Sequence, residues 1–136
     1  MNLPSGSPPR ALTIAGSDSG GCAGIQADLK TFSALGVYGT CAVTAVTAQN
    51  TVGVQKIEEI SPEMVAAQIK VLLYDIKPSV IKTGMLSSKS VIGAVVTTLL
   101  ENDTGPGISQ PNERIKLVVD PVMVAKGGAV LLHGDA

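Results

Sequence analysis

Two acidic residues near the N-terminus, Asp18 and Asp28, lie where a glycine-rich turn leads into a helical segment. Residues 11–30 read ALTIAGSDSGGCAGIQADLK, an order of apolar, small polar and helical segments that is typical of phosphate-binding loops. Neither phosphate motif fits, because Cys22 and Ala23 replace the Lys-Ser pair of a Walker A loop and Asp18 occupies the place of the middle glycine of the dinucleotide motif. Asp18 would also repel a polyphosphate, so the turn is predicted to border a small polar ring.

Asp28 falls within the apolar stripe of the helix predicted over residues 22–35. The stripe has i, i+4, i+7 spacing and consists of Ile25, Leu29 and Phe32. A lone carboxylate on an apolar face costs several kcal/mol unless it is paired or hydrogen-bonded. Two interpretations stay open: Asp28 bonds to neighbouring backbone or to a Ser/Thr hydroxyl, or it borders a crevice and accepts hydrogen bonds from a ligand. Gln49 offers both donors and acceptors, so the ligand interpretation has Asp28 and Gln49 facing one flat heterocycle.

Strand and helix signals alternate along the chain. Strands are predicted at residues 11–15, 38–51, 53–60, 79–84 and 115–123, and helices at 22–35, about 61–75 and about 87–101. The helix starts are marked by Ser61 and Ser87, and Gly36 is a predicted C-cap. This alternation predicts one α/β domain with a mostly parallel sheet and helices on both faces. The domain is expected at residues 11–136, with a disordered tail at 1–10 and a surface loop at 102–114.

Composition excludes several classes of protein. Of 136 residues, 45% are hydrophobic and 15% charged, and the net charge of -1 offers no basic excess for nucleic acid or an anionic membrane. No apolar run approaches the roughly 20 residues that span a bilayer, and the N-terminus has neither a secretory nor a transit signal. Cys22, Cys41 and His133 form no metal-binding pattern. A cytoplasmic protein with reduced thiols is the expectation.

The predicted strands end in residues that could bind a ligand. The sequences at these ends are GSDSGG, AQNT, KTGML and DPVM. In open parallel sheets, ligands bind in the crevice outside the carboxyl ends of the strands. Loops are commonly polar and rich in glycine, so the polar residues at any single strand end could belong to an ordinary surface loop. All four together favour a binding crevice.

Residues 11–51, KTGML and VVDPVMVAKGG resemble the hydroxymethylpyrimidine/phosphomethylpyrimidine kinases of thiamine biosynthesis, with Cys22 in place of an expected Gly or Ala. These enzymes are ribokinase-like and related to pyridoxal kinases. The resemblance implies a transferase that uses ATP and Mg²⁺ to phosphorylate 4-amino-5-hydroxymethyl-2-methylpyrimidine and its monophosphate. Two alternatives stay open, a pyridoxal kinase-like enzyme and a non-catalytic pyrimidine-binding fragment.

The resemblance also implies roles for individual residues. The implied pyrimidine pocket consists of Gly16 and Ala23, which allow close backbone approach, Asp28 and Gln49, which hydrogen-bond the ring, and Met85 and Val122, which pack on it. The implied metal and phosphate side consists of Asp120 and Lys126. Ordinary core packing is an alternative for Met85 and Val122, as is a solvated position for Lys126.

The glycine-rich anion turn that this family uses for catalysis is absent from the sequence, so no catalytic residue is assigned. The resemblance therefore implies the N-terminal part of the fold, with the C-terminal part missing. We expect the chain to be inactive alone, and to act with a complementing C-terminal half or as a homo-oligomer. A sheet of this kind is also expected to leave an uncovered apolar edge.

Overall fold

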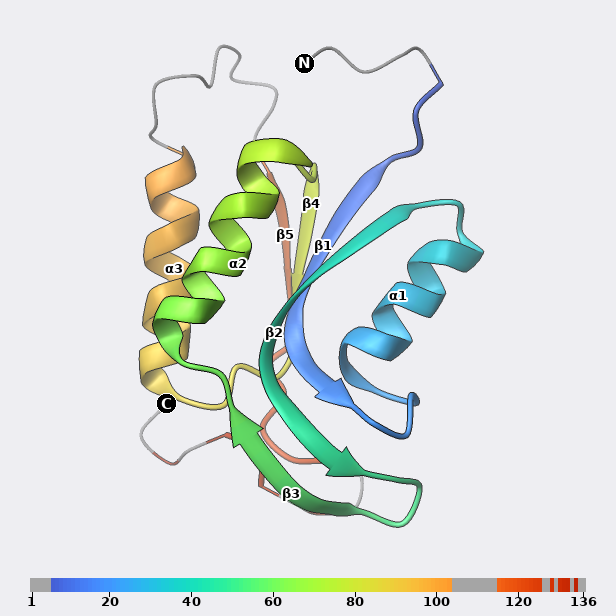
Figure 1. Cartoon of the computed structure of the whole chain (residues 1–136), viewed down its shortest axis with the longest axis vertical. Helices are drawn as coiled ribbons and strands as arrows, with labels where there is room; N and C mark the ends of the chain where they lie inside the picture. Colours follow the sequence, from blue (N-terminus) through green and yellow to red (C-terminus); the bar gives the residue numbers. More distant parts are fainter. Residues whose placement is uncertain (1–5, 104–114, 126–127, 129, 133, 135–136) are drawn as a thin grey trace.

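The computed structural model describes residues 6–103, 115–125, 128, 130–132 and 134. It contains a five-stranded sheet with the order β3-β2-β1-β4-β5 (Figure 1). The strands are β1 (Arg10–Asp18), β2 (Tyr38–Gln49), β3 (Val54–Glu59), β4 (Val80–Thr83) and β5 (Lys116–Val119). The helices are α1 (Gly24–Ala34), α2 (Pro62–Asp75) and α3 (Lys89–Asp103). β1, β2, β4 and β5 are parallel, and β3 pairs antiparallel with β2.

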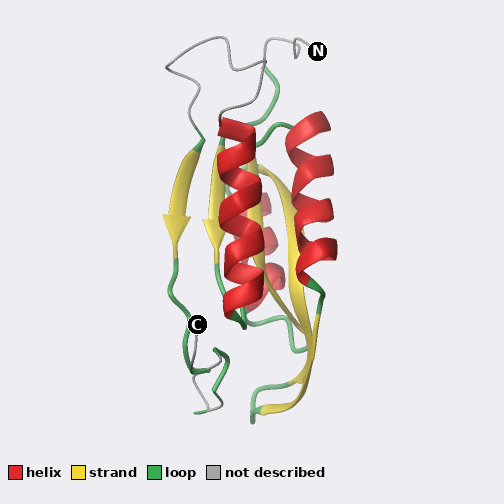
Figure 2. Ribbon diagram, turned by 90° about the vertical axis from the view of Figure 1, so that its left-hand side faces the viewer, coloured by secondary structure: helices red, strands yellow, loops and turns green. Residues whose placement is uncertain are grey.

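The helices cover both faces of the sheet, as predicted. α1 packs on β1 and β2 from one side, while α2 packs on β2 from the other side and lies beside α3 (Figures 1 and 2). The chain runs from β1 outward to β2 and β3, and then crosses to β4 on the opposite side of β1. Strand order therefore reverses between β1 and β4, and the crevice at their carboxyl ends is where an open α/β sheet binds ligands.

The core is aliphatic and lies between the sheet and the α2–α3 layer. Its buried members are Leu12, Ile14, Ala42, Val65, Ile69, Leu73, Ile81, Val91 and Val95. α2 contributes its residues at four-residue spacing, so one helical face is buried along its length. Each large aliphatic side chain contributes about 1.5–3 kcal/mol on burial, and these contacts hold the strand ends in fixed relative positions.

Two of the three predicted helix signals agree with the structure. The Ser61 Oγ accepts the Met64 N–H at 3.3 Å, which confirms the predicted cap of α2. Gly36 adopts φ +70° just after α1 and donates its N–H to the Ser33 carbonyl. The predicted cap of α3 at Ser87 is wrong by one residue.

The cap of α3 is Ser88, whose Oγ accepts the Val91 N–H at 3.5 Å. Ser88 immediately precedes the helix, so its Oγ is placed to reach the third helical residue. Ser87 is buried with φ +65°, and its Oγ has no hydrogen-bond partner among the described residues.

Element boundaries differ from the prediction at several places; β1, for example, continues to Asp18 and β5 ends at Val119. β1 begins at Arg10, which was assigned to the tail, because the Arg10 carbonyl accepts the Ser79 N–H. α1 begins at Gly24 rather than at residue 22, and α3 continues through Asp103. Of the loop predicted at 102–114, the first two residues belong to α3, and residues 104–114 lie outside the described residues. No helix in the described part of the chain has the length and apolar character needed to cross a membrane.

Candidate functional site

Gly16 and Met85 meet at the carboxyl ends of β1 and β4. A Cβ on Gly16 would lie 2.6 Å from the Met85 Cε, so a larger residue at position 16 would require the flexible end of the Met85 side chain to shift. The Met85 carbonyl accepts a hydrogen bond of 2.6 Å from the Thr44 hydroxyl, which fixes the backbone after β4. The structure therefore brings together two residues predicted for the ring pocket.

The glycine-rich turn is organised by the carboxylate of Asp18. Asp18 Oδ1 accepts the Gly20 N–H at 2.7 Å, and Oδ2 accepts the N–H groups of Cys22 and Ala23, both at 2.9 Å. These backbone N–H groups are the kind that would otherwise hold a phosphate. The buried Asp18 carboxylate takes that place, so the turn stabilises itself and offers these donors to no external anion. Ala23, predicted to approach the ligand, uses its N–H inside the turn.

Gly24 explains where α1 starts. It has φ +56°, and a Cβ on it would lie 2.2 Å from the Gly16 carbonyl oxygen. A bridge between Ser17 and Gly24 places the first residue of the helix directly against β1. The helix therefore begins beside Gly16 and can carry its side chains along the strand. The sequence analysis did not single out Gly24, although the glycine-rich run offered a signal.

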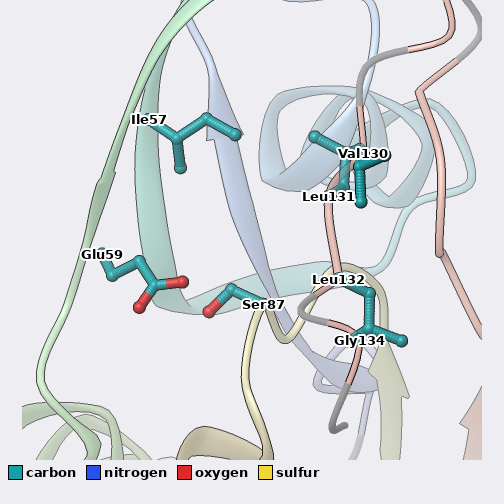
Figure 3. Close-up of a pocket in the computed structure, with 7 residues that line it drawn as sticks. All are labelled: Ile57, Glu59, Ser87, Val130, Leu131, Leu132 and Gly134. Carbon is teal, nitrogen blue, oxygen red and sulfur yellow. The ribbon is translucent and has the colours of Figure 1, made fainter.

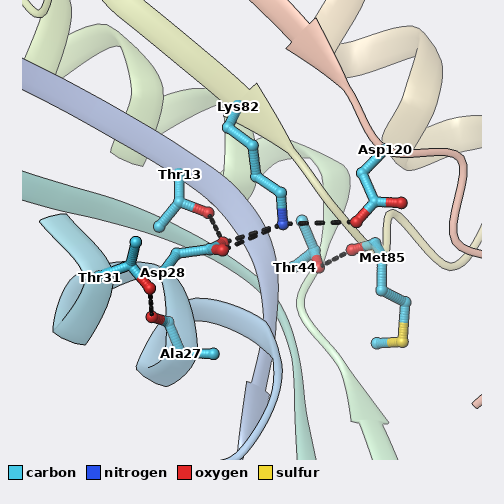
Figure 4. Close-up of polar contacts among 8 residues, drawn as sticks. All are labelled: Thr13, Ala27, Asp28, Thr31, Thr44, Lys82, Met85 and Asp120. Atoms are coloured by element: carbon cyan, nitrogen blue, oxygen red, sulfur yellow. Dashed lines mark hydrogen bonds and ion pairs between the residues drawn. The ribbon is translucent and has the colours of Figure 1, made fainter. Parts of the chain in front are cut away.

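Asp28 has partners within the chain. Its Oδ2 accepts the Thr13 hydroxyl at 2.5 Å, and the Lys82 Nζ lies 3.0 Å from Oδ2 and 3.2 Å from Oδ1 (Figure 4). The Lys82 Nζ also lies 3.7 Å from the Asp120 Oδ2. The side chains of Asp28 and Lys82 are 18% and 23% exposed, so each shields the charge of the other from an apolar surrounding. Of the two interpretations of Asp28, these contacts favour the structural one.

Lys82 is a further site residue that sequence reasoning missed. It lies inside β4, between Ile81 and Thr83, which are both buried. A lysine is almost never buried unless it is paired, so its position in an apolar strand was a usable signal for a carboxylate partner. The structure supplies two such partners, from α1 and from the end of β5.

Gln49 is the last residue of β2. Its Oε1 accepts a hydrogen bond from the Thr47 hydroxyl at 3.3 Å, whereas Asp28 bonds to Thr13 and Lys82. The expectation that Asp28 and Gln49 face one ring stays a prediction.

The end of β5 adds Asp120 and Val122 to the crevice. The Asp120 N–H donates to the Thr83 carbonyl at 3.1 Å, which places Asp120 beside the end of β4. Val122 is half-buried, and its N–H donates to the Asp120 carbonyl at 2.8 Å. The Asp120 side chain is 53% exposed, so its carboxylate is accessible to a ligand. Lys126, the other residue predicted for this side, lies outside the described residues.

A separate cavity of about 360 Å³ lies between β3 and the C-terminal segment (Figure 3). It is lined by Ile57, Glu59, Ser87, Val130, Leu131, Leu132 and Gly134. None of the predicted site residues that the structure describes lines it. We place the candidate site instead at the carboxyl ends of β1, β4 and β5, where Gly16, Met85 and Asp120 lie.

Comparisons with known proteins identify the family of the chain. A family model described as phosphomethylpyrimidine kinase matches residues 18–136. The hydroxymethylpyrimidine/phosphomethylpyrimidine kinase of Rhizobium meliloti is 51% identical over 126 residues, which cover 93% of this chain and 43% of that protein. The chain thus spans less than half the length of this curated relative.

Solved structures show the same fold. The phosphomethylpyrimidine kinase of Clostridium difficile 630 matches with a TM-score of 0.77 and 46% identity, covering 93% of this chain and 50% of its own. The pyridoxal kinase of Staphylococcus aureus in complex with pyridoxal matches with a TM-score of 0.72 and 35% identity, covering 90% and 42%. These neighbours confirm the predicted ribokinase-like fold. The chain belongs to the phosphomethylpyrimidine kinase family.

Proposed function

We propose that this chain provides the pyrimidine-binding side of an ATP-dependent kinase of thiamine biosynthesis. Its substrates would be 4-amino-5-hydroxymethyl-2-methylpyrimidine and the monophosphate of that compound. The observation that carries the proposal is the contact between Gly16 and Met85 at the point where the strand order reverses. Family membership supports the same assignment.

The ring would lie against the Gly16 backbone and the Met85 side chain. Glycine allows a flat ring to approach the backbone closely, and a thioether packs well on an aromatic face. Val122 and Ala23 would border the ring, and the Gln49 amide would hydrogen-bond a ring edge from the end of β2. Because Asp28 is bonded to Thr13 and Lys82, its proposed role is to position Lys82 rather than to contact the ring.

Asp120 would face the phosphoryl groups and Mg²⁺. Magnesium is usually held by one or two carboxylates together with substrate phosphates, and the exposed Asp120 carboxylate fits this use. The ion would supply positive charge to the transferred phosphoryl group. Lys82, 3.7 Å from Asp120, would keep that carboxylate at the crevice, and Lys126 stays a proposed phosphate contact. The ATP phosphates would be held away from the first turn, whose N–H groups Asp18 occupies.

Titration calorimetry with the hydroxymethylpyrimidine tests the ring site. We expect Met85→Ala to weaken binding about tenfold, because the ring loses one packing face worth about 1.4 kcal/mol. Met64→Ala is the matched control, since Met64 is exposed on α2. Circular dichroism must show that Met85→Ala still folds. Equal affinity for the wild type and a folded Met85→Ala protein would argue against this pocket.

Pyridoxal is the second candidate ring, because the Staphylococcus aureus structure that matches this chain contains it. Competition calorimetry with both compounds distinguishes a hydroxymethylpyrimidine site from a pyridoxal site. We expect the pyrimidine to bind more tightly. A clear preference for pyridoxal would favour a pyridoxal kinase-like function instead.

We propose that catalysis requires a complementing C-terminal half of the kinase. We expect little product from this chain with the pyrimidine and Mg-ATP, and product when a complementing C-terminal half of a relative is added. Binding without turnover in both mixtures would favour a non-catalytic pyrimidine-binding protein, and product from the chain alone would contradict the expected need for a partner. A cytoplasmic location belongs to the proposal, because Cys22 and Cys41 are both free thiols.

A further inference from the structure

The hydroxyl group of Ser19, in the glycine-rich turn after β1, bonds to the end of β2. The Ser19 Oγ donates to the Gln49 carbonyl at 2.6 Å and accepts the Gln49 N–H at 2.8 Å. In a parallel pair of strands, the N–H and C=O of one residue point to the same neighbouring strand. β1 ends at Asp18, so the Ser19 side chain takes the place of the next backbone partner and satisfies both polar groups of Gln49.

The turn places this hydroxyl independently of Gln49. The Asp18 carboxylate accepts the Gly20 N–H at 2.7 Å, and the Asp18 carbonyl accepts the Gly21 N–H at 3.0 Å, so hydrogen bonds fix the backbone on both sides of Ser19. The turn also lies close to β2, since a Cβ on Gly20 would be 3.4 Å from the Gln49 carbonyl oxygen. The Ser19 Oγ is therefore held at the end of β2 by the turn itself.

The segment that follows Gln49 is closed by its own hydrogen bonds. The Asn50 N–H donates to the Gly53 carbonyl at 3.1 Å, and the Asn50 Oδ1 accepts the N–H groups of Val52 and Gly53 at 2.9 and 3.1 Å. The Gln49 side chain is also held, because its Oε1 accepts the Thr47 hydroxyl at 3.3 Å. The Ser19 hydroxyl joins this locally closed segment to the first turn, and Gln49 lies at the junction.

We propose that Ser19 is a positioning residue for substrate binding, which orients the Gln49 amide toward the edge of the pyrimidine ring. This role rests on the proposed function, in which that amide hydrogen-bonds the ring. Ser19 acts through the backbone of Gln49 and not as a donor to the ring, because its one hydroxyl proton is given to the Gln49 carbonyl. Holding Gln49 in place before the ligand arrives lowers the ordering cost of binding.

Titration calorimetry with the hydroxymethylpyrimidine tests this role through two substitutions of equal shape. Ser19→Thr keeps a hydroxyl and should bind like the wild type. Ser19→Val has the shape of threonine without the hydroxyl, and we expect it to bind about three- to tenfold more weakly, the equivalent of one net hydrogen bond. Ser33→Ala is the control, because Ser33 is exposed on α1 and its loss should leave affinity unchanged. Circular dichroism must show that each variant folds.

A double-mutant cycle separates positioning from a general effect on structure. In a Gln49→Ala background the amide is gone, so Ser19→Val should cause no further loss of affinity. An equal loss in both backgrounds would show that Ser19 acts by a route other than Gln49. Hydrogen exchange without ligand gives a second readout, because the Gln49 N–H should exchange faster in Ser19→Val once its acceptor is removed.

The outcomes distinguish the positioning role from the proposed function. If the wild-type chain binds the pyrimidine and Ser19→Val binds it equally tightly, the positioning role is wrong and the proposed function stands. If the wild-type chain does not bind the pyrimidine, the proposed function is refuted, and the role of Ser19 in substrate binding is refuted with it. Unchanged exchange of the Gln49 N–H in Ser19→Val would show that the hydroxyl does not hold Gln49.

Discussion

Replacing Asp28 with asparagine removes one negative charge between Thr13 and Lys82 and changes the shape little. Breaking a fully buried ion pair costs about 3–5 kcal/mol, while an exposed pair contributes about 0–1 kcal/mol. Asp28 and Lys82 are about one-fifth exposed, which places this pair between the two limits. Asparagine still accepts the Thr13 hydroxyl, and Lys82 keeps Asp120 at 3.7 Å. We expect the free energy of unfolding to fall by about 2 kcal/mol, from the middle of these ranges.

Urea unfolding followed by circular dichroism measures this loss, and the melting temperature should fall by about 6–10 °C. Asp75→Asn is the control, because Asp75 is exposed at the end of α2 and its loss should leave stability nearly unchanged. Calorimetry should show unchanged affinity for the pyrimidine. The opposite pattern would refute the structural role: unchanged stability with affinity lower by about 1.5–3 kcal/mol, the range of a hydrogen bond to a charged group.

Two further predictions concern the first turn and the thiols. Gly24→Ala should destabilise the protein by more than about 2 kcal/mol in urea unfolding, because its Cβ would clash with the Gly16 carbonyl at a positive φ. Gly93→Ala should instead stabilise α3 by up to about 1 kcal/mol, since nothing lies near its Cβ, and equal effects of the two substitutions would contradict the packing of α1 on β1. Iodoacetamide should modify the exposed Cys22 before Cys41, because burial raises the pKa of the Cys41 thiol and only the thiolate reacts. Peptide mass spectrometry measures both rates, and faster labelling of Cys41 would contradict its burial.

The fold was largely predictable because its signals are local. α2 begins with a hydroxyl cap and a proline, and its buried residues Val65, Ile69 and Leu73 repeat with the helical period. The start of α3 was predicted one residue early because both Ser87 and Ser88 could cap a helix. Only the backbone conformation decides between them, since the φ of +65° turns Ser87 away from the capping position.

The site was less predictable because its contacts join distant parts of the chain. Lys82 and Asp28 are 54 positions apart, and they meet only because β4 pairs with β1 beneath α1. The sequence pattern marked Asp28 as needing a partner but could not identify it. Gly16 and Met85 were predicted together from the family resemblance, and they pack closely because Gly16 has no Cβ where the Met85 Cε lies.

The charges of the crevice favour a neutral ring rather than a charged one. The Asp18 carboxylate is used by the backbone of its own turn, and the Asp28 carboxylate is used by Thr13 and Lys82. Neither acid is left to attract a cationic ligand at the ring side, where Gly16 and Met85 offer an apolar contact. The exposed carboxylate of the crevice, Asp120, lies at the end of β5, beyond Lys82. Under the proposed function, a substrate with a neutral aromatic ring at one end and a phosphorylated hydroxymethyl group at the other would match this separation, because the metal ion that accompanies phosphate needs a carboxylate and the ring does not.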